Sequence, residues 1–139
     1  MTTKDYVVVV QCHIVKERCS GYLCEEAFSK RIGAFLGYPV DRQIRFLSLT
    51  CGGCCGRAVH RKLAHLIKRI GKKENIEKDR IGVHLSSCIS FDSCHGPECP
   101  HKEYLKTIIC KKLGLDVVEG SRISELTDRR RKEGKYKDR

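Results

Sequence analysis

The sequence predicts an α/β fold built on a mostly parallel sheet of about four strands with flanking helices. Apolar runs that suit strands alternate along the chain with amphipathic segments that suit helices. The run at 6–11 shows no polar alternation, which is typical of a strand covered on both faces, as in a parallel sheet. This run is therefore expected to be a central strand.

The first crossover helix is expected between Leu23 and Leu36, where apolar residues recur at helical spacing. Gly37 and Pro39 follow and should close the segment. The second strand is expected at 44–50, and a glycine-rich turn comes directly after it.

The second half of the chain continues the alternation. An apolar stripe along 59–70, with basic residues between its members, predicts a second amphipathic helix. A third strand at 81–87 precedes a third helix at 104–113, for which Gly114 is a natural stop. A fourth strand is expected at 115–119.

This order of elements implies right-handed crossovers and a small three-layer, Rossmann-like or flavodoxin-like fold. We expect a single domain over residues 1–127, with a short helical turn near Ile123 and Leu126, and a basic charged tail over 128–139. The chain shows no apolar stretch long enough to span a membrane and no signal-peptide pattern at 1–5. These features favour a cytoplasmic location.

Ten cysteines and six histidines are many for 139 residues. In a reducing cytosol, clustered cysteines more often bind metal or carry out redox chemistry than form disulfides. The three strong strand candidates each run into a cysteine, at Cys12, Cys51 and Cys88. Because ligands of open α/β sheets bind outside the carboxyl ends of the strands, the sequence predicts a thiol-lined site, with a metal as its ligand.

Further cysteines surround these three. The turn from Cys51 to Cys54 places two thiols around two glycines before a helix N-terminus, which favours thiolate and suits metal binding or redox chemistry. A second cluster at 88–101 matches no standard zinc-finger spacing. A third group adds Cys19 and Cys24 beside Cys12.

These motifs resemble the CGGC-domain family, named for the motif that stands at 51–54, and the resemblance extends to about Gly120. It implies a metal-binding role, commonly suggested to involve zinc, with no established reaction. The sequence departs from the family pattern at Cys55, where proline is expected, and at Ser121, where a Gly-Thr-His ending is common. The matching features are Cys12, Cys19, Cys24, Phe28, Phe35, Cys51, Cys54, the segment 84–88, and Cys99 with Pro100.

The remaining cysteines rank lower as ligands. Cys55 and Cys94 lie outside the matching motifs, and Cys110 falls within a predicted helix, where simple burial is expected. The roles of Cys55, Cys94, His95 and His101 stay open.

Three histidines are expected to be structural or solvated. His84 lies inside the third strand, where a core or surface imidazole is more common than a ligand. His60 and His65 lie on the second helix and should face solvent.

Seven motif cysteines exceed the four ligands of one tetrahedral zinc. Two zinc sites or an iron–sulfur cluster would use more of them, although the usual ferredoxin spacings are absent. Zinc is favoured because the family resemblance implies it, and an iron–sulfur cluster is the alternative. We hypothesise that four cysteines form the floor of the site and that three close it from the loops. The floor consists of Cys12, Cys51, Cys54 and Cys88, and the loops contribute Cys19, Cys24 and Cys99.

Two enzymatic alternatives remain open. Cys51 and Cys54 could cycle between dithiol and disulfide, with Cys51 as the attacking thiolate. Cys51 and Arg57 have the spacing of the Cys-x5-Arg loop of low-molecular-weight phosphatases and arsenate reductases, which could bind an oxyanion. Those families place the loop after the first strand, whereas here it follows the second.

The formal net charge of +11 also raises nucleic acid as a partner. Part of this excess lies in the tail at 128–139, and every metal-bound cysteine would subtract one charge. Aromatic residues make up only 6% of the chain and tryptophan is absent, so platforms for base stacking are sparse. A metal ion is therefore the favoured partner, and no protein partner is indicated.

Overall fold

The computed structural model describes residues 4–17, 19–53, 56–90 and 99–121. A four-stranded, all-parallel sheet with strand order β2-β1-β3-β4 forms the middle of the molecule. The strands are β1 (Tyr6–Gln11), β2 (Arg45–Thr50), β3 (Ile81–Leu85) and β4 (Asp116–Glu119). The α-helices are α1 (Tyr22–Ser29), α2 (Arg57–Glu74), α3 (Ser87–Ser90) and α4 (Lys102–Thr107), and the remaining helical turns are η1 (Val15–Glu17), η2 (Gly33–Phe35), η3 (Lys78–Arg80) and η4 (Ile108–Lys112).

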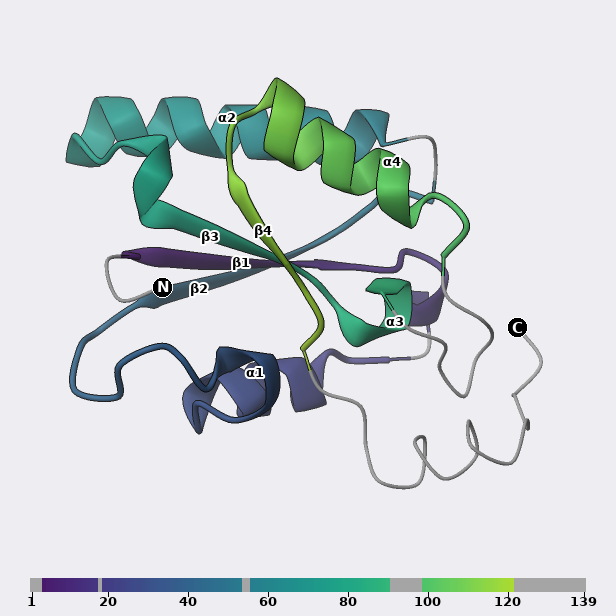
Figure 1. Cartoon of the computed structure of the whole chain (residues 1–139), viewed down its shortest axis with the longest axis horizontal. Coiled ribbons are helices and arrows are strands. Elements are labelled where there is room, and N and C mark those ends of the chain that lie inside the picture. The colour runs from purple at the N-terminus through teal and green to yellow at the C-terminus, as the bar shows by residue number, and fades with distance from the viewer. Residues whose placement is uncertain (1–3, 18, 54–55, 91–98, 122–139) are drawn as a thin grey trace.

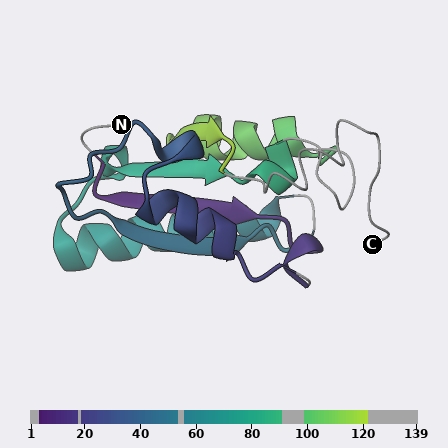
Figure 2. The same cartoon turned by 90° about the horizontal axis from the view of Figure 1, so that it is seen from below.

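The helices cover both faces of the sheet, which confirms the predicted α/β fold. Helix α1 lies on one face, and α2 and α4 lie on the other (Figures 1 and 2). Right-handed crossovers require this arrangement, because the chain moves from β1 to β2 in one direction along the sheet and from β2 to β3 in the opposite direction. The chain therefore leaves the neighbouring strands β1 and β3 toward opposite faces, and the gap between their carboxyl ends is the topological switch point of the sheet.

Strand β1 supplies both halves of the core. Val7 and Val9 pack in a cluster with Phe28 and other residues on the α1 side, while Val8 and Val10 pack in the larger cluster under α2 and α4. All four valines are fully buried, and burial of each contributes about 1.5–3 kcal/mol. Their burial on both faces explains why the run at 6–11 has no polar alternation.

The first crossover helix is shorter than the sequence predicted. Helix α1 ends at Ser29, and the chain forms the separate turn η2 instead of continuing to Leu36. The break lies at Arg31, whose φ of 54° is left-handed and incompatible with a continuing helix. The Arg31 guanidinium lies over the Phe28 ring and donates to the Phe28 carbonyl at 2.6 Å, which holds the break in place.

Two further boundaries differ from the predicted ones. The third strand ends at Leu85 because Ser87 already begins α3. The third helix is divided, since α4 passes into the π-helix η4, in which the amide of Leu113 donates to the carbonyl of Ile108 at 3.1 Å. Gly114 stops this segment with a φ of 69°, as predicted. The expected turn at 123–126 and the tail at 128–139 lie outside the described residues.

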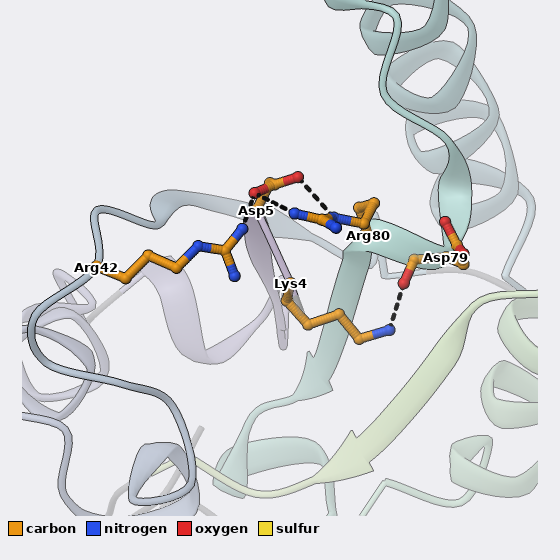
Figure 3. Close-up of polar contacts among 5 residues, drawn as sticks. All are labelled: Lys4, Asp5, Arg42, Asp79 and Arg80. Carbon is orange, nitrogen blue, oxygen red and sulfur yellow. Dashed lines mark hydrogen bonds and ion pairs between the residues drawn. The ribbon is translucent and has the colours of Figure 1, made fainter. Parts of the chain in front are cut away.

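A cluster of charged residues ties the amino ends of the strands together (Figure 3). Arg80 donates to the Asp5 carboxylate from Nε at 2.7 Å and from Nη2 at 3.0 Å, and Arg42 reaches the same carboxylate from the opposite side. The Asp5 amide also bonds the Arg80 carbonyl at 2.8 Å. The bonds and charge of Arg80, assisted by Arg42, hold the pKa of Asp5 below its usual value.

Lys4 lies beside this cluster and is almost buried, with 6% of its surface exposed. Its ammonium donates to the Asp79 carbonyl at 2.7 Å and pairs with the Asp116 carboxylate at the start of β4. The buried charge is therefore partnered, and it joins β1 to β4 across the intervening strand β3.

The lowered pKa of Asp5 predicts an acid-sensitive contribution to stability. Asp5 stabilises the fold above its unfolded pKa, and this contribution is lost as pH falls through the lower folded value. Asp5→Asn should therefore reduce the free energy of unfolding in urea between about pH 5 and 7, and the difference from wild type should shrink below about pH 4. Asp41→Asn, at an exposed position, is the control and should change stability little at any pH. A difference for Asp5→Asn that is constant down to about pH 2 would contradict this assignment.

The start of α2 yields a second stability prediction. Gly56 has a φ of 91°, and an added Cβ would lie 2.5 Å from Ile108 Cδ1. Gly56→Ala should therefore destabilise the protein by about 1–3 kcal/mol in urea unfolding. Gly71→Ala is the matched control, because Gly71 lies inside α2 with open space around it. This control should stabilise the protein by up to about 1 kcal/mol, and equal effects of the two substitutions would be inconsistent with the packing described.

Candidate metal centre

The parallel register places cysteines at one edge of the sheet. Gln11 pairs with Thr50 at the ends of β1 and β2, so Cys12 and Cys51 follow side by side. The Cys51 amide donates to the Gln11 carbonyl at 3.0 Å and extends the ladder by one residue. Both cysteines are buried at the end of the larger core cluster.

Cys12 and Cys88 meet at the topological switch point between β1 and β3. The Cys12 amide donates to Cys88 Sγ at 3.4 Å, and the Ser86 hydroxyl lies 2.8 Å from the same sulfur. The Ser86 amide bonds the Val10 carbonyl at 2.9 Å, which continues the β1–β3 pairing beyond Leu85. Two strands thus bring together cysteines that are 76 residues apart in the chain.

The glycine-rich turn after β2 packs against the residue that follows Cys12. Gly52 and Gly53 have φ values of 80° and 69°, a backbone conformation that favours glycine. A Cβ at Gly53 would lie 3.3 Å from the His13 ring, so the second glycine also allows close approach. The His13 amide in turn donates to Cys51 Sγ at 3.4 Å.

Helix α1 contributes Cys24 from the other face of the sheet. Cys24 Sγ lies 3.1 Å from the Ser121 hydroxyl, just after β4. Ser121 and Ser87 hold each other through reciprocal bonds from amide to hydroxyl of 3.2 Å and 3.0 Å. Ser121 therefore joins a candidate ligand on α1 to the segment that follows β3.

Sequence reasoning missed the serines Ser86, Ser87 and Ser121 as parts of this edge. It also missed Gln11, which is 3% exposed, lies at the end of β1 beside Gly21, and has no hydrogen-bond partner for its Oε1 among the described residues. Position is the signal that could have found them, because each is the last residue of a strand or follows it within two residues.

Two other candidate ligands lie farther out. Cys19 is exposed, and its sulfur accepts a hydrogen bond from the Gly21 amide at 3.4 Å. Cys99 is half-buried against the larger core, and its sulfur accepts from the His101 amide at 3.4 Å. Cys54, Cys55, Cys94 and His95 lie outside the described residues.

Residues that the sequence ranked as non-ligands have mixed outcomes. Cys110 is exposed rather than buried, because it lies on the outer side of η4, so that expectation was wrong. His84 is a core imidazole, as predicted, bonded to the Tyr38 hydroxyl at 2.8 Å and the Gly120 carbonyl at 3.1 Å. His60 and His65 are exposed on α2, as predicted.

Burial raises the pKa of the Cys88 thiol to about 11. Its hydrogen bonds from Ser86 and the Cys12 amide act in the opposite direction, while neighbouring Cys12 and Cys24 raise the pKa further. Cys12 and Cys24 are therefore both close enough to Cys88 to disfavour its thiolate form. Without a cation, Cys88 is a neutral thiol at neutral pH.

The described residues do not by themselves complete a coordination sphere. Among residues 4–17, 19–53, 56–90 and 99–121, no group of three or more Cys, His, Asp or Glu side chains is arranged to hold a metal ion. The donor chemistry suits a thiophilic metal, but a full set of ligands requires donors beyond these residues or a closer approach of the thiols already present.

The family model of the CGGC domain matches residues 6–122, which span all four strands and the cysteine-bearing edge. The chain belongs to the CGGC domain family. This family is generally associated with metal binding. No curated protein and no solved structure matches the chain. In the described part of this CGGC domain, no helix is long and apolar enough to cross a membrane.

In the described part of this CGGC domain, no hydrogen bond joins Arg57 to the Cys51 thiol. Arg57 is exposed at the start of α2 and lines a cavity with Tyr104 and Lys112, whereas Cys51 is buried and is not part of that lining. The described residues therefore give no support to a phosphatase-like or arsenate-reductase-like site that uses Cys51 and Arg57.

The raised pKa of Cys88 predicts slow alkylation in reduced, metal-free CGGC domain. At about pH 7.5, iodoacetamide should modify exposed Cys19 much faster than Cys88, because only thiolates react. The rate at Cys88 should keep rising with pH up to its pKa of about 11, which separates protonation from simple shielding. Peptide mapping by mass spectrometry measures both sites in one sample. A Cys88 rate that reaches its plateau below about pH 9 would contradict the assigned environment.

Proposed function

We propose that this CGGC domain binds zinc through thiolates at the carboxyl edge of its sheet, centred on the switch point between β1 and β3. The observation that carries the proposal is the contact between the Cys12 amide and Cys88 Sγ, with Cys24 close enough to raise the pKa of Cys88. The ends of β1 and β3 thus bring Cys12 and Cys88 into contact, which supports a thiolate site at this edge of the sheet.

The hydrogen bonds around the sulfurs support thiolate ligation. The amides of Cys12 and His13 donate to Cys88 and Cys51, and serine hydroxyls lie against the sulfurs of Cys88 and Cys24. Donors of this kind stabilise the negative charge that metal-bound thiolates carry and fix their orientation. A neutral thiol that is merely packed in a core does not need such hydrogen-bond donors.

We assign two of the four zinc ligands to Cys12 and Cys88, which are in contact, and the other two to cysteines among Cys24, Cys51 and Cys54. Cys19 and Cys99 would close the site from the loops. Binding would release protons, because the Cys88 thiol must ionise to coordinate the metal. A bound zinc would also hold the ends of β1, β3 and α1 together as a cross-link.

The alternatives to zinc differ in measurable ways. An iron–sulfur cluster would use more of the cysteines and would bring iron, acid-labile sulfide and visible colour. A dithiol enzyme using Cys51 and Cys54 would need no metal and would reduce a disulfide substrate with an external dithiol. Its second cysteine lies outside the described residues, so the geometry does not favour this function over metal binding.

Metal content is the direct test. Protein purified without oxygen or added metal should contain stoichiometric zinc and be colourless. Cys88→Ser and Cys12→Ser should lose the metal, whereas Cys110→Ser, at an exposed site on η4, should keep it. A Cys88→Ser protein with the metal content of wild type would contradict the assignment. If the wild-type protein contained iron and acid-labile sulfide, the bound group would be an iron–sulfur cluster and not zinc.

A milder substitution tests the same assignment with less risk that the variant fails to fold. Ser86→Ala keeps all the cysteines but removes the hydroxyl beside Cys88 Sγ. It should weaken zinc binding by about 10–100-fold, measured by competition with a chromophoric chelator. An unchanged zinc affinity would mean that Cys88 is not a ligand. Circular dichroism of each variant confirms that the fold is retained.

A further inference from the structure

A separate cavity lies on the α2 and α4 side of the molecule. Its volume is about 290 Å³, and its walls come from the start of α2, from α4 and from η4. Its lining residues are Gly56, Arg57, His60, Tyr104, Ile108 and Lys112. Cys12, Cys51 and Cys88 are not among the described residues that line this cavity.

The polar groups of the cavity converge from separate elements. Arg57 and His60 lie three residues apart on α2 and share one face of that helix. Tyr104 comes from α4, and Lys112 comes from the last position of η4. The widened turn of the π-helix is a feature that recurs at functional sites, and here it carries a cation to the cavity wall.

The base of the cavity is apolar and tightly packed. Gly56 lies against the side chains of Ile108 and Leu105, and its φ of 91° favours glycine. The close approach of the start of α2 to η4 fixes the distance between the elements that bear Arg57 and Lys112.

Charge in the cavity is positive and uncompensated. No carboxylate is among its described lining residues, and the side chains of Arg57, His60, Tyr104 and Lys112 form no hydrogen bond or ion pair with other described residues. Nearby Lys106 provides the contrast, because it is paired with Glu119 and Glu103. A group of donors without an acceptor among the described residues points to an anionic ligand.

We propose that this cavity binds a phosphate group, either free or as a small phosphate monoester. The Arg57 guanidinium can present a planar fork of donors to two phosphate oxygens, and Lys112 adds a point charge. The Tyr104 hydroxyl and the His60 ring supply further donors, and the α2 N-terminus favours negative charge in the same place. A cavity of about 290 Å³ is at the small end of the range for ligand pockets, which suits a phosphate with a small organic substituent.

Equilibrium binding tests this proposal on the whole, metal-loaded protein. Inorganic phosphate and glycerol 2-phosphate are titrated into the protein by calorimetry. The buffer contains about 0.15 M chloride, which screens weak, nonspecific attraction between exposed charges. We expect saturable binding of one anion per chain. Tighter binding of the ester identifies an organic phosphate as the ligand, and equal binding identifies the free anion.

Matched variants locate the site. Arg57→Gln and Lys112→Gln should each weaken binding by roughly tenfold or more, because each removes a charge-assisted hydrogen bond. Arg61→Gln and Lys111→Gln remove the same charge from α2 and η4 at exposed positions outside the cavity lining, and they should bind as wild type does. Absence of binding, or equal losses in all four variants, would overturn the proposal. Unchanged zinc content in all four separates failure of this site from failure of the metal site.

Discussion

The burial of β1 on both of its faces and along both of its edges is the constraint on which the rest of the structure depends. Its valines contact the core on either side of the sheet, and its backbone pairs with β2 and β3 at once. A one-residue shift of this strand would exchange its two sets of core side chains. The same shift would move Cys12 relative to Cys51 and Cys88, so the packing of the core and the geometry of the thiols are set together.

The sequence predicted the parts of the fold that depend on hydrophobic pattern. Uninterrupted apolar runs predicted the strands and their parallel arrangement, and an apolar stripe at helical spacing predicted the long helix α2. It failed where a local contact overrides the pattern. The stacking of Arg31 on Phe28 ends α1 early, and the π-turn of η4 leaves Cys110 in solvent although its segment reads as a buried helix.

The sequence predicted part of the candidate site, as it predicted part of the fold. Cys12, Cys51 and Cys88 could be placed at one edge because a cysteine after a strand has little freedom in a parallel sheet. The relation of Cys24 to Ser121 could not, since it depends on how α1 lies across the sheet and on where β4 ends. Nor could the cation-lined cavity, because its lining residues come from α2 and from α4 and η4, which are distant in sequence and pack together where Gly56 contacts Ile108.

Ser121 connects more of the molecule than its size suggests. Its hydroxyl contacts Cys24 and accepts from the Ser87 amide, its amide donates to Ser87, and its carbonyl accepts from the Ala34 amide at 3.3 Å. Local opening of α1, η2 or the segment after β3 must therefore break a bond to this one residue. The hydrogen-exchange rate of the Ala34 amide, a half-buried group in η2, thus reports whether the thiol edge is intact.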